Sequence, residues 1–417
     1  MLLDELKKKK ILILGFGREG RDTLLFLKKK FPKKTIGIAD QKFDKDYLKT
    51  LKNYDIIIKS PGVPPYVIAP FITKNQKITS QTEIFFENCP GTIIGITGTK
   101  GKSTTASLVH AVLKQGGIKT HLIGNIEVPV LQFLHTATPE DVFVYELSSF
   151  QLTNLSLSPH IAVFLNLYPE HLDYYGGNFR SYANAKANIT KHQSEEDFLI
   201  YNSKDPDVCK IAKSSKAQKL PFGKNLRSSP SQKEAELLYS WIASTEPAIL
   251  IGKLFGIPEK KIQQAIRNFK PLPHRLEKVG EFKGVTFYND SLATIPEATI
   301  AAIEALGPKV YTLIAGGYDR GISFEKLGKD IGKSSVRVLV LFPTTGKKIL
   351  ASIKNPPKHF FAKNMQEAVW FAYLHTAKGK ICILSPAASS FNMFKDYKDR
   401  GEQFIKWVKK LGNEKNA

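Results

Sequence analysis

The sequence has little cysteine and no long apolar run. Only three cysteines occur among 417 residues, at Cys89, Cys209 and Cys382, and their spacing matches no metal or redox motif. We therefore expect buried, reduced thiols and no disulfide. No stretch approaches the roughly 18 consecutive apolar residues of a membrane span, and the amino terminus, MLLDELKKKK, lacks the apolar core of a signal peptide. These absences predict a cytoplasmic protein with no membrane partner.

Acidic residues are also few relative to basic ones. The chain has 61 Lys and Arg against 38 Asp and Glu, which gives a formal net charge of +23. Such an excess is compatible with nucleic acid, an anionic membrane surface or an anionic small substrate. The bases lie in short clusters such as Lys7 to Lys10 and Lys28 to Lys30, without interleaved aromatic residues to stack on bases. We interpret them as a solvated surface and expect no nucleic-acid partner.

The length and the pattern of apolar runs predict several domains. A chain of 417 residues exceeds what one hydrophobic core usually serves. Short apolar runs alternate with helical patterns from the amino terminus, restart at TIIGITGTKGKS, and restart again after Pro271 and Pro273, which interrupt any helix. We predict α/β domains over residues 1–91, 92–271 and 272–417. The lysine- and serine-rich stretch from Lys204 to Lys233 is expected to wind over the surface.

The clearest motif is a glycine-rich loop between an apolar strand and an amphipathic helix. It reads GITGTKGKS over residues 95–103. Glycines let backbone N–H groups turn onto phosphate oxygens, the helix N-terminus adds a positive dipole end, and Lys102 neutralises the terminal phosphates. Ser103 is suited to hold Mg²⁺. The spacing departs from the standard pattern, because the residue five before Gly101 is Ile96.

Two polar side chains follow the next strands of this segment. Glu146 comes directly after the run VFVY, and His171 lies in NLYPEHLD after IAVFLN. Both are expected at the carboxyl ends of strands beside the phosphate loop, where open α/β sheets bind ligands. Of the two, Glu146 is the better ligand for Mg²⁺. Taken alone, a histidine such as His171 is more often structural or exposed.

A second glycine motif, GFGREG over residues 15–20, follows a strand and opens a helix, and Asp40 ends the next strand. This is a dinucleotide-type fingerprint. The same turn can bind a nucleotide diphosphate, bind NAD, or only pack a helix against a sheet. An NAD-dependent dehydrogenase is therefore one alternative, although it leaves the TGTKGKS loop unexplained.

Taken together, the motifs resemble the Mur ligase family over almost the whole chain. The matching segments, in the family's order, are TGTKGKS, Gly124-Asn125-Ile126, ELSSFQL from Glu146 to Leu152, Glu170-His171, Pro273-His274-Arg275, Asn289-Asp290-Ser291, Ala315-Gly316-Gly317 and Ser385-Pro386-Ala387. The resemblance implies a Rossmann-like UDP-binding domain, a central P-loop ATPase-type domain with a mostly parallel sheet, and a Rossmann-like amino-acid-binding domain. It also implies an ATP-dependent ligase that joins D-glutamate to UDP-N-acetylmuramoyl-L-alanine through an acyl phosphate, acting on these small molecules as a monomer.

The resemblance assigns roles to individual residues. Ser103 and Glu146 would hold one Mg²⁺ and His171 with Lys186 a second, Lys186 being carbamylated. A carbamate is an anionic oxygen ligand, whereas an ammonium beside a dication is repelled. From its neighbours SYANAKAN alone, Lys186 would be a surface residue. The implied catalytic residues are Lys102, His171 and Lys186. The implied ATP contacts are Gly98, Thr99, Lys100, Gly101, Lys102, Ser103, Thr104, Arg275 and Asp290, with His274 as a neighbour. The implied UDP-substrate contacts are Gly17, Asp40, Ser60, Gly62 and Asn125, and the D-glutamate contacts are Thr294, Arg320, Ser390 and Tyr397.

Some positions depart from the family pattern. The segment STEPAILIGKLFGIP lacks the Gly-x-His-Asn sequence, which leaves the adenine contacts open. Leu292 replaces the usual lysine, Ile295 the usual asparagine, and Arg320 stands where lysine is more common. The alternatives are a sister ligase adding L-alanine, a diamino acid or a dipeptide, and folylpolyglutamate synthetase. The last is disfavoured by GFGREG and SPG, which suit a UDP-binding domain.

Overall fold

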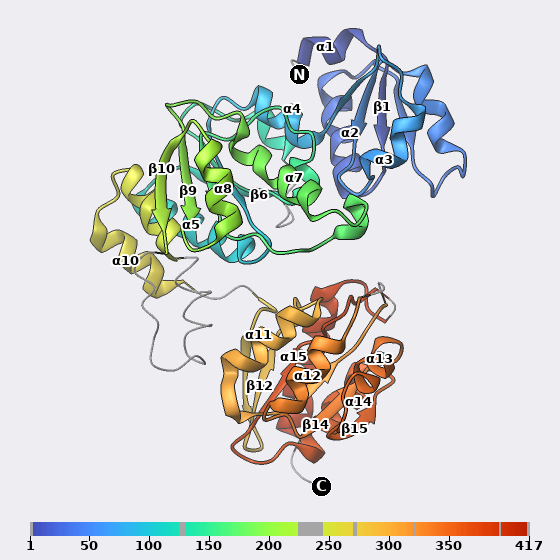
Figure 1. Cartoon of the computed structure of the whole chain (residues 1–417), viewed down its shortest axis with the longest axis vertical. Helices are drawn as coiled ribbons and strands as arrows, with labels where there is room; N and C mark the ends of the chain where they lie inside the picture. Colours follow the sequence, from blue (N-terminus) through green and yellow to red (C-terminus); the bar gives the residue numbers. More distant parts are fainter. Residues whose placement is uncertain are drawn as a thin grey trace. The chain divides into compact units, whose positions relative to one another are not determined.

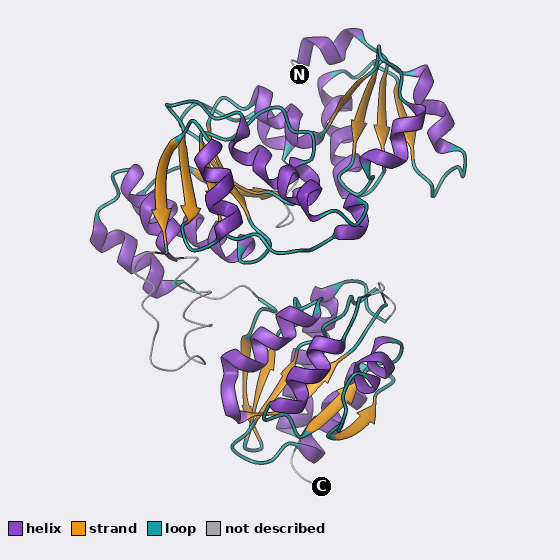
Figure 2. Cartoon of the chain, viewed as in Figure 1, coloured by secondary structure: helices purple, strands orange, loops and turns teal. Residues whose placement is uncertain are grey.

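The computed structural model describes residues 3–124, 130–223, 245–269, 273–319, 322–391 and 393–414. These residues form two compact units, one containing the described chain up to residue 269 and the other the chain from residue 273. In both units helices cover the faces of mostly parallel sheets (Figures 1 and 2). The predicted α/β class is confirmed. Among the described residues, no helix combines the length and apolar character needed to cross a bilayer.

The first unit begins with a four-stranded parallel sheet in the order β2-β1-β3-β4. Its strands are β1 (Ile11–Leu14), β2 (Ile36–Ala39), β3 (Ile56–Lys59) and β4 (Lys77–Thr79). Its helices are α1 (Leu3–Lys8), α2 (Arg18–Lys30), η1 (Tyr47–Asn53), α3 (Pro65–Ile68), η2 (Ala69–Phe71) and α4 (Gln81–Asn88). Leu14 lies in register with Ala39 and Lys59, so β1, β2 and β3 end at one edge of the sheet.

The second sheet of this unit has six parallel strands in the order β10-β9-β8-β5-β7-β6. They are β5 (Thr92–Thr97), β6 (Thr120–Gly124), β7 (Val142–Glu146), β8 (Ile161–Phe164), β9 (Phe198–Asn202) and β10 (Gln218–Phe222). The helices are α5 (Lys102–Gly116), η3 (Leu131–His135), α6 (Ser149–Leu152), η4 (Leu172–Tyr175), α7 (Phe179–Lys191), α8 (Pro206–Ser214), a segment over 245–254 and α10 (Glu259–Asn268). Because β5 lies between β7 and β8, the carboxyl ends of these three strands are neighbours.

The stretch from Lys204 holds regular structure that the sequence analysis did not predict. It contains helix α8 and the edge strand β10. Val208 and Ala212, one helical turn apart, are buried, and the partly buried Ile211 packs against the same core, so these three apolar residues dock α8. Pro221 lies within β10, where an edge position tolerates the missing N–H. Residues 224–233 of the stretch lie outside the described residues.

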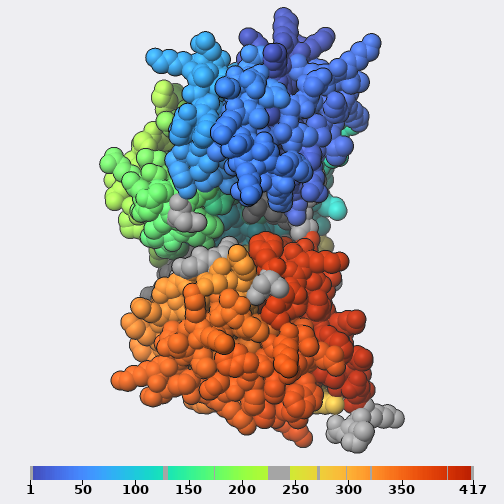
Figure 3. Space-filling model, turned by 90° about the vertical axis from the view of Figure 1, so that its right-hand side faces the viewer, coloured from blue at the N-terminus to red at the C-terminus, as the bar shows by residue number. Residues whose placement is uncertain are grey.

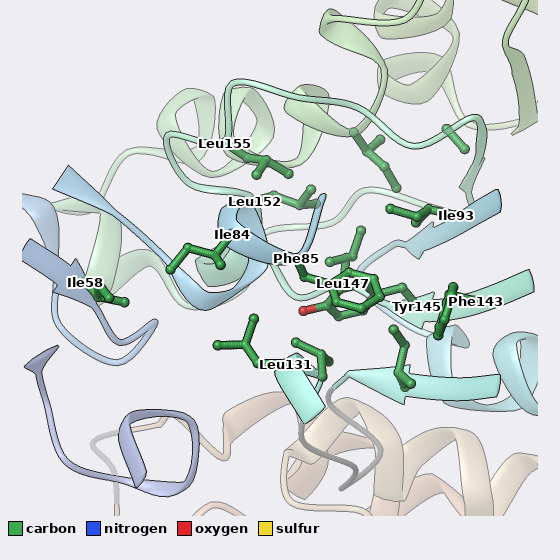
Figure 4. Close-up of a cluster of buried hydrophobic side chains, with 14 of the residues drawn as sticks. Ile58, Ile84, Phe85, Ile93, Leu131, Phe143, Tyr145, Leu147, Leu152 and Leu155 are labelled. Atoms are coloured by element: carbon green, nitrogen blue, oxygen red, sulfur yellow. The ribbon is translucent and has the colours of Figure 1, made fainter. Parts of the chain in front are cut away.

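A common core joins the two sheets of the first unit. Ile58 of β3 and Phe85 of α4 belong to the same buried cluster as Phe143 and Tyr145 of β7 (Figure 4). The ring of Phe85 meets that of Tyr145 edge-on with 5.7 Å between centroids, and the Tyr145 hydroxyl lies 3.3 Å from Thr82 Oγ1. In the space-filling view, the blue atoms of the first sheet's segment lie against the green atoms of the central segment (Figure 3). Burial of each such large apolar side chain is worth about 1.5–3 kcal/mol, so this core fixes the two sheets together.

The second unit is built on a six-stranded sheet in the order β11-β12-β16-β13-β14-β15, in which only the β11–β12 pair is antiparallel. The strands are β11 (Glu277–Phe282), β12 (Val285–Asn289), β13 (Val310–Ala315), β14 (Val338–Leu341), β15 (Lys358–Phe361) and β16 (Ile381–Leu384). The helices are α11 (Pro296–Leu306), η5 (Gly307–Lys309), α12 (Glu325–Lys333), α13 (Thr345–Ala351), α14 (Met365–His375) and α15 (Tyr397–Asn413). The carboxyl ends of β12, β16 and β13 are adjacent, which brings the loops after them together.

Candidate active site

The glycine-rich loop connects the carboxyl end of β5 to α5. Gly101 is the N-cap of α5 and has φ of +85°, a left-handed conformation that glycine adopts without steric cost. Lys102 and Ser103 therefore form the first turn of the helix. The N–H groups of a first turn have no partner within the helix and carry the positive end of its dipole, which favours an anion at this point.

Asn166, which follows β8, holds the loop in shape. Its side-chain Oδ1 accepts from the Lys100 N–H at 2.8 Å, its Nδ2 donates to the Lys100 carbonyl at 3.1 Å, and its own carbonyl accepts from the Thr99 N–H at 3.0 Å. Thr99 Oγ1 also lies 2.9 Å from the Tyr182 hydroxyl. The amides of Thr99 and Lys100 are thus engaged within the protein, so a nucleotide would meet these two residues through other atoms.

Three lysines converge on the loop. The Lys102 ammonium donates to the carbonyls of Gly98 and Thr99, each at 3.0 Å. The Lys186 ammonium, from α7, donates to the same Gly98 carbonyl at 2.8 Å. Lys100 pairs with Glu170 at 2.9 Å. This concentration of positive charge is suited to the polyphosphate of a nucleotide.

Lys186 is buried, so the surface position suggested by its neighbours in the sequence is wrong. Its side chain is 2% exposed and its ammonium stands 5.1 Å from the centre of the Tyr182 ring. Burial, followed by repulsion from Lys102, lowers the pKa of Lys186 well below that of an ordinary lysine, and Glu170 and Glu146 only partly oppose this. A neutral amine is therefore accessible at this position.

Glu146, Glu170 and His171 lie at the strand ends beside the loop, as the sequence predicted for Glu146 and His171. Glu146 ends β7 in register with Ile96 of β5 and is 1% exposed. Burial acts to raise the pKa of Glu170, but the charge and hydrogen bond of Lys100, together with His171 and Lys102, lower the pKa overall. His171 Nε2 lies 3.9 Å from Glu170 Oε2, and its ring packs against Phe150 with 4.9 Å between centroids.

A cavity of about 280 Å³ opens beside these groups. It brings together Lys102, His171 and Lys186, the three side chains predicted to be catalytic. It is lined by Glu19, Pro61, Lys102, Ser148, Ser149, Phe150, Gln151, Glu170, His171, Tyr182 and Lys186. Glu19 lies in α2 and Pro61 follows β3, so the segment that forms the first sheet contributes to the lining along with the central segment. The Tyr174 hydroxyl strengthens this junction by donating to the Pro61 carbonyl at 2.9 Å.

The predicted UDP-substrate residues that the structure describes gather at the carboxyl ends of β1, β2 and β3. Ser60 Oγ donates to the Gly15 carbonyl at 2.7 Å and closes the glycine turn. The Asp40 carboxylate accepts from the Phe16 N–H at 2.6 Å, and this bond is the main cause of its lowered pKa. Gly17 and Gly62 are exposed beside the turn. Asn125 lies outside the described residues.

In the second unit, Asp290 directly follows β12, and Arg275, half-buried, precedes β11. Asp290 accepts hydrogen bonds from Ser385 Oγ at 2.8 Å and from the Leu276 N–H at 3.2 Å. Burial raises the pKa of Asp290 to about 7. His274 Nδ1 lies 2.9 Å from Asn289 Nδ2. These hydrogen bonds link the start of β11, the end of β12 and the loop after β16.

Three of the predicted D-glutamate residues are described: Thr294 and Ser390 lie on loops after β12 and β16, and Tyr397 begins α15. Ser390 is buried in the segment after β16, and the Tyr318 N–H donates to the neighbouring Ser389 carbonyl at 2.8 Å. The carbonyl of Tyr397, at the start of α15, accepts from Ser291 Oγ at 2.7 Å. Thr294 is half-buried in the loop after β12. Arg320 lies outside the described residues.

Known proteins resemble this chain along nearly its whole length. Residues 96–246 match the Mur ligase middle domain, and residues 274–388 match the Mur ligase, glutamate ligase domain. The UDP-N-acetylmuramoylalanine–D-glutamate ligase of Acetivibrio thermocellus is 32% identical, covering 98% of this chain and 97% of that protein. The chain belongs to the Mur ligase family. The ligase of the same name from Geobacillus kaustophilus is 34% identical, over 86% of this chain and 84% of its own length.

Solved structures of other family members share the fold of this Mur ligase. The MurF ligase of Thermotoga maritima in complex with ADP has a TM-score of 0.60 at 17% identity, covering 97% of this chain and 96% of that one. The UDP-N-acetylmuramate–alanine ligase of the same organism has a TM-score of 0.59 at 15% identity, covering 97% and 100%. At such low identity the likeness establishes the fold alone.

The donors available near the loop of this Mur ligase fit Mg²⁺ that arrives with a nucleotide. Among the described residues, no group of three or more His, Cys, Asp and Glu side chains is arranged to hold a metal. The predicted ligands Ser103, Glu146 and His171 offer one hydroxyl, one carboxylate and one imidazole. Mg²⁺ commonly takes one or two carboxylates and completes its octahedron with water and phosphate oxygens. The donor set is therefore suited to a metal shared with substrate.

Arg400, in α15, is a structural residue of the second unit that the sequence analysis missed. It is fully buried, and its guanidinium donates to Ser291 Oγ at 3.0 Å, to the Ser291 carbonyl at 2.8 Å and to the Ala388 carbonyl at 3.0 Å. Burial lowers the pKa of Arg400 to about 9. The side chain ties the loop after β12 to the loop after β16, and so positions the segments that carry Asp290 and Ser390.

Replacing Arg400 with methionine should destabilise the second unit by about 2–4 kcal/mol, because two buried carbonyls and a hydroxyl lose their donors. Urea unfolding of the full chain, followed by tryptophan emission, to which Trp370 and Trp407 of this unit contribute, measures the effect. Arg337→Met is the matched control, since Arg337 is exposed and donates only to carbonyls of its own loop. Equal unfolding midpoints for the two variants would contradict the role assigned to Arg400.

Proposed function

We propose that this Mur ligase is an ATP-dependent enzyme that joins D-glutamate to UDP-N-acetylmuramoyl-L-alanine, a step in the synthesis of peptidoglycan precursors. The observation that carries the proposal is the meeting of Lys102, Lys186 and His171 in one cavity beside the glycine-rich loop, in a chain whose relatives bear that name over nearly their full length. A cavity lined by cations at a helix N-terminus suits the transfer of a phosphoryl group.

The reaction proceeds in two steps. A carboxylate oxygen of the muramyl-alanine attacks the γ-phosphorus of ATP, the bond to the bridging oxygen breaks, and ADP leaves with an acyl phosphate as the product. The amino nitrogen of D-glutamate then attacks the acyl carbon, a C–N bond forms, phosphate leaves, and the nitrogen loses its proton. Neither step needs a nucleophile from the protein, since positioning and charge stabilisation dominate phosphoryl transfer.

The chain's own residues would contribute mainly by charge and by position. Lys102 would offset the negative charge on the transferring group, and the first turn of α5 would orient it. Ser103 and Glu146 would hold one Mg²⁺ and His171 with Lys186 a second. When bound, Mg²⁺ supplies Lewis-acid charge that draws anionic oxygens together.

Carbamylation of Lys186 would make that residue a metal ligand. The nitrogen of a neutral amine attacks the carbon of CO₂, and one proton is released as the carbamate forms. Burial of Lys186 next to Lys102 favours the neutral amine that this reaction requires. The carbamate then presents two oxygens to a cation, in a site where an ammonium would oppose it.

The same proposal assigns a substrate to each part of the chain. We infer a Rossmann-like UDP-binding domain over residues 1–91, an ATP-binding P-loop domain over 92–271 and an amino-acid-binding domain over 272–417. Arg320 would offer a planar fork to one carboxylate of D-glutamate, and the hydroxyls of Thr294, Ser390 and Tyr397 would donate to the other. A neutral acceptor would leave the fork unpaired.

A phosphate-release assay tests the function directly. The purified chain is supplied with ATP, Mg²⁺ and UDP-N-acetylmuramoyl-L-alanine, and each member of a panel of D- and L-amino acids is added in turn. D-glutamate should release phosphate at least about tenfold faster than L-glutamate, L-alanine or lysine, a difference of about 1.4 kcal/mol. Preference for another acceptor would indicate a sister ligase, and release independent of any amino acid would rule out the proposed activity.

A further inference from the structure

Glu19 is a residue of the cavity lining whose carboxyl group the proposed reaction does not use. It is the second residue of α2, directly after the glycine turn of the first sheet, and it lines the same cavity as Lys102 and His171. Anionic substrates are expected in this cavity, so a carboxylate in its wall would repel them. The protonation state of Glu19 therefore matters for binding.

The contacts of Glu19 distinguish its two oxygens. Gln151 Nε2 donates to Glu19 Oε1 at 2.9 Å. The orientation of that amide is fixed, because Gln151 Oε1 accepts from the backbone N–H of Ser148 at 3.0 Å and from its hydroxyl at 3.1 Å. Glu19 Oε1 is thus an acceptor. Glu19 Oε2 is buried and has no hydrogen-bond partner among the described residues.

A buried carboxylate oxygen without a donor is costly, whereas a protonated oxygen becomes a donor itself. Burial is the largest influence on Glu19 and raises its pKa to about 7, although the bond from Gln151 and the charge of Lys59 oppose the rise. The Lys59 ammonium does not satisfy Oε2, since it donates to the carbonyls of Val63 at 2.8 Å and Ser60 at 3.3 Å. Burial lowers the pKa of Lys59 to about 8.

The other charged groups around Glu19 come from both sheets of the unit. Asp22, one turn further along α2, accepts from Gln81 at 2.8 Å and from Gln132 at 3.0 Å, and its charge adds to the rise of the Glu19 pKa. Arg18 precedes Glu19 and acts in the opposite direction. The titratable groups that share the cavity are Lys102, Glu170, His171, Tyr182 and Lys186.

We propose that Glu19 binds the UDP-linked substrate as a neutral carboxylic acid, donating a hydrogen bond from Oε2 to an anionic oxygen of that ligand, so that binding takes up a proton. The inference rests on the proposed function for the identity of the ligand. A phosphate oxygen and a carboxylate oxygen accept such a bond equally well, and either would be repelled by an ionised Glu19.

The expected pH dependence follows from the sign of this coupling. Neutral Glu19 favours the anion and ionised Glu19 opposes it, so the affinity is highest below pH 7 and falls as the pH rises through about 7. The substrate carboxyl titrates near pH 3.5 and the diphosphate stays ionised, so the ligand does not change charge in this range. With a free pKa of about 7, the Kd at pH 8 should be about tenfold that at pH 6.

Isothermal titration calorimetry with UDP-N-acetylmuramoyl-L-alanine measures both the affinity and the protons taken up. Titrations between pH 6 and 8.5 in buffers of different ionisation enthalpy should show an uptake that approaches one proton above pH 7. Glu19→Gln keeps an N–H donor in the same position but cannot ionise. It should bind like the unaltered chain at pH 6, bind about tenfold more tightly at pH 8, and lose that proton uptake.

Two further variants complete the test. Asp22→Asn, which neutralises a neighbouring buried carboxyl outside the cavity lining, should keep the proton uptake and the pH dependence, with a midpoint shifted to slightly lower pH because the charge of Asp22 adds to the rise of the Glu19 pKa. Glu19→Ala, which removes the donor, should bind more weakly at every pH.

A Glu19→Gln variant with the unaltered slope and proton uptake would overturn the inference. If the chain fails to bind the UDP-linked substrate at any pH, the proposed function is wrong instead, while tight binding without pH dependence contradicts only the role of Glu19.

Discussion

The Lys102→Ala variant should lose essentially all ligase activity. Lys102 is held over the loop by the carbonyls of Gly98 and Thr99, so its ammonium is positioned before any nucleotide binds. Its charge would be most valuable when negative charge shifts onto the transferring phosphoryl oxygens, and removal of one such preorganised group typically costs 10²–10³ in rate. Phosphate release with saturating substrates measures the loss.

Lys114→Ala is the control for Lys102→Ala, since Lys114 is an exposed lysine in the last turn of the same helix. It should keep the full rate. If Lys102→Ala retained more than about a tenth of the rate, a loss below ~1.4 kcal/mol, the assignment of residues 95–103 as a phosphate-binding loop would be wrong. An intact unfolding midpoint would show that the variant still folds.

The Lys186→Ala variant should be inactive and should recover partly when a short carboxylate such as acetate or formate is added. Alanine leaves space where the buried side chain lay beside Gly98 and Tyr182, and a small carboxylate can supply the oxygens of the missing carbamate. The recovered rate should rise with carboxylate concentration until the position is filled. Removal of bicarbonate from the buffer should lower the rate of the unaltered chain for the same reason.

Lys191→Ala, an exposed lysine in the last turn of α7, provides the matched control for Lys186→Ala. It should keep the full rate and gain nothing from added carboxylate. Full activity of Lys186→Ala without carboxylate would remove Lys186 from the metal site. Loss of activity with no recovery by any carboxylate would leave a structural role, through the bond to Gly98, as its function.

The sequence was informative where local pattern determines position. The run VFVY predicted a strand followed by Glu146, and β7 extends one residue further to include Glu146. The run IAVFLN predicted a strand before His171, and β8 covers Ile161–Phe164 of that run. Parallel pairing then brings the ends of β7 and β8 to the loop after β5, because all three strands run in the same direction. The positions of these strand ends could thus be predicted from each apolar run and the polar residue that follows it.

The environment of individual side chains was not predictable in this way. Lys186 lies in a helix of mainly small and polar residues, and its burial depends on where α7 packs against the loop. Glu19 meets Gln151, which is 132 residues away in the sequence, only because the two sheets share a core. The residues next to Arg400 in α15 are those of an exposed helix, but loops that follow two distant strands cover its side chain. In each case tertiary packing overrides the local pattern.

The strand order of the central sheet also sets constraints on how the first unit folds. β5 pairs with β7 and β8, and every pairing in this sheet is parallel, so no two of its strands can join by a tight hairpin. The loop after β5 further needs Asn166 to hold the amides of Thr99 and Lys100. Asn166 lies 66 residues after Lys100 in the sequence. During synthesis the loop therefore cannot form these hydrogen bonds until Asn166 has been added to the chain. Such non-local pairing slows folding, so the glycine-rich loop should reach its final conformation late, after the helices around it have formed.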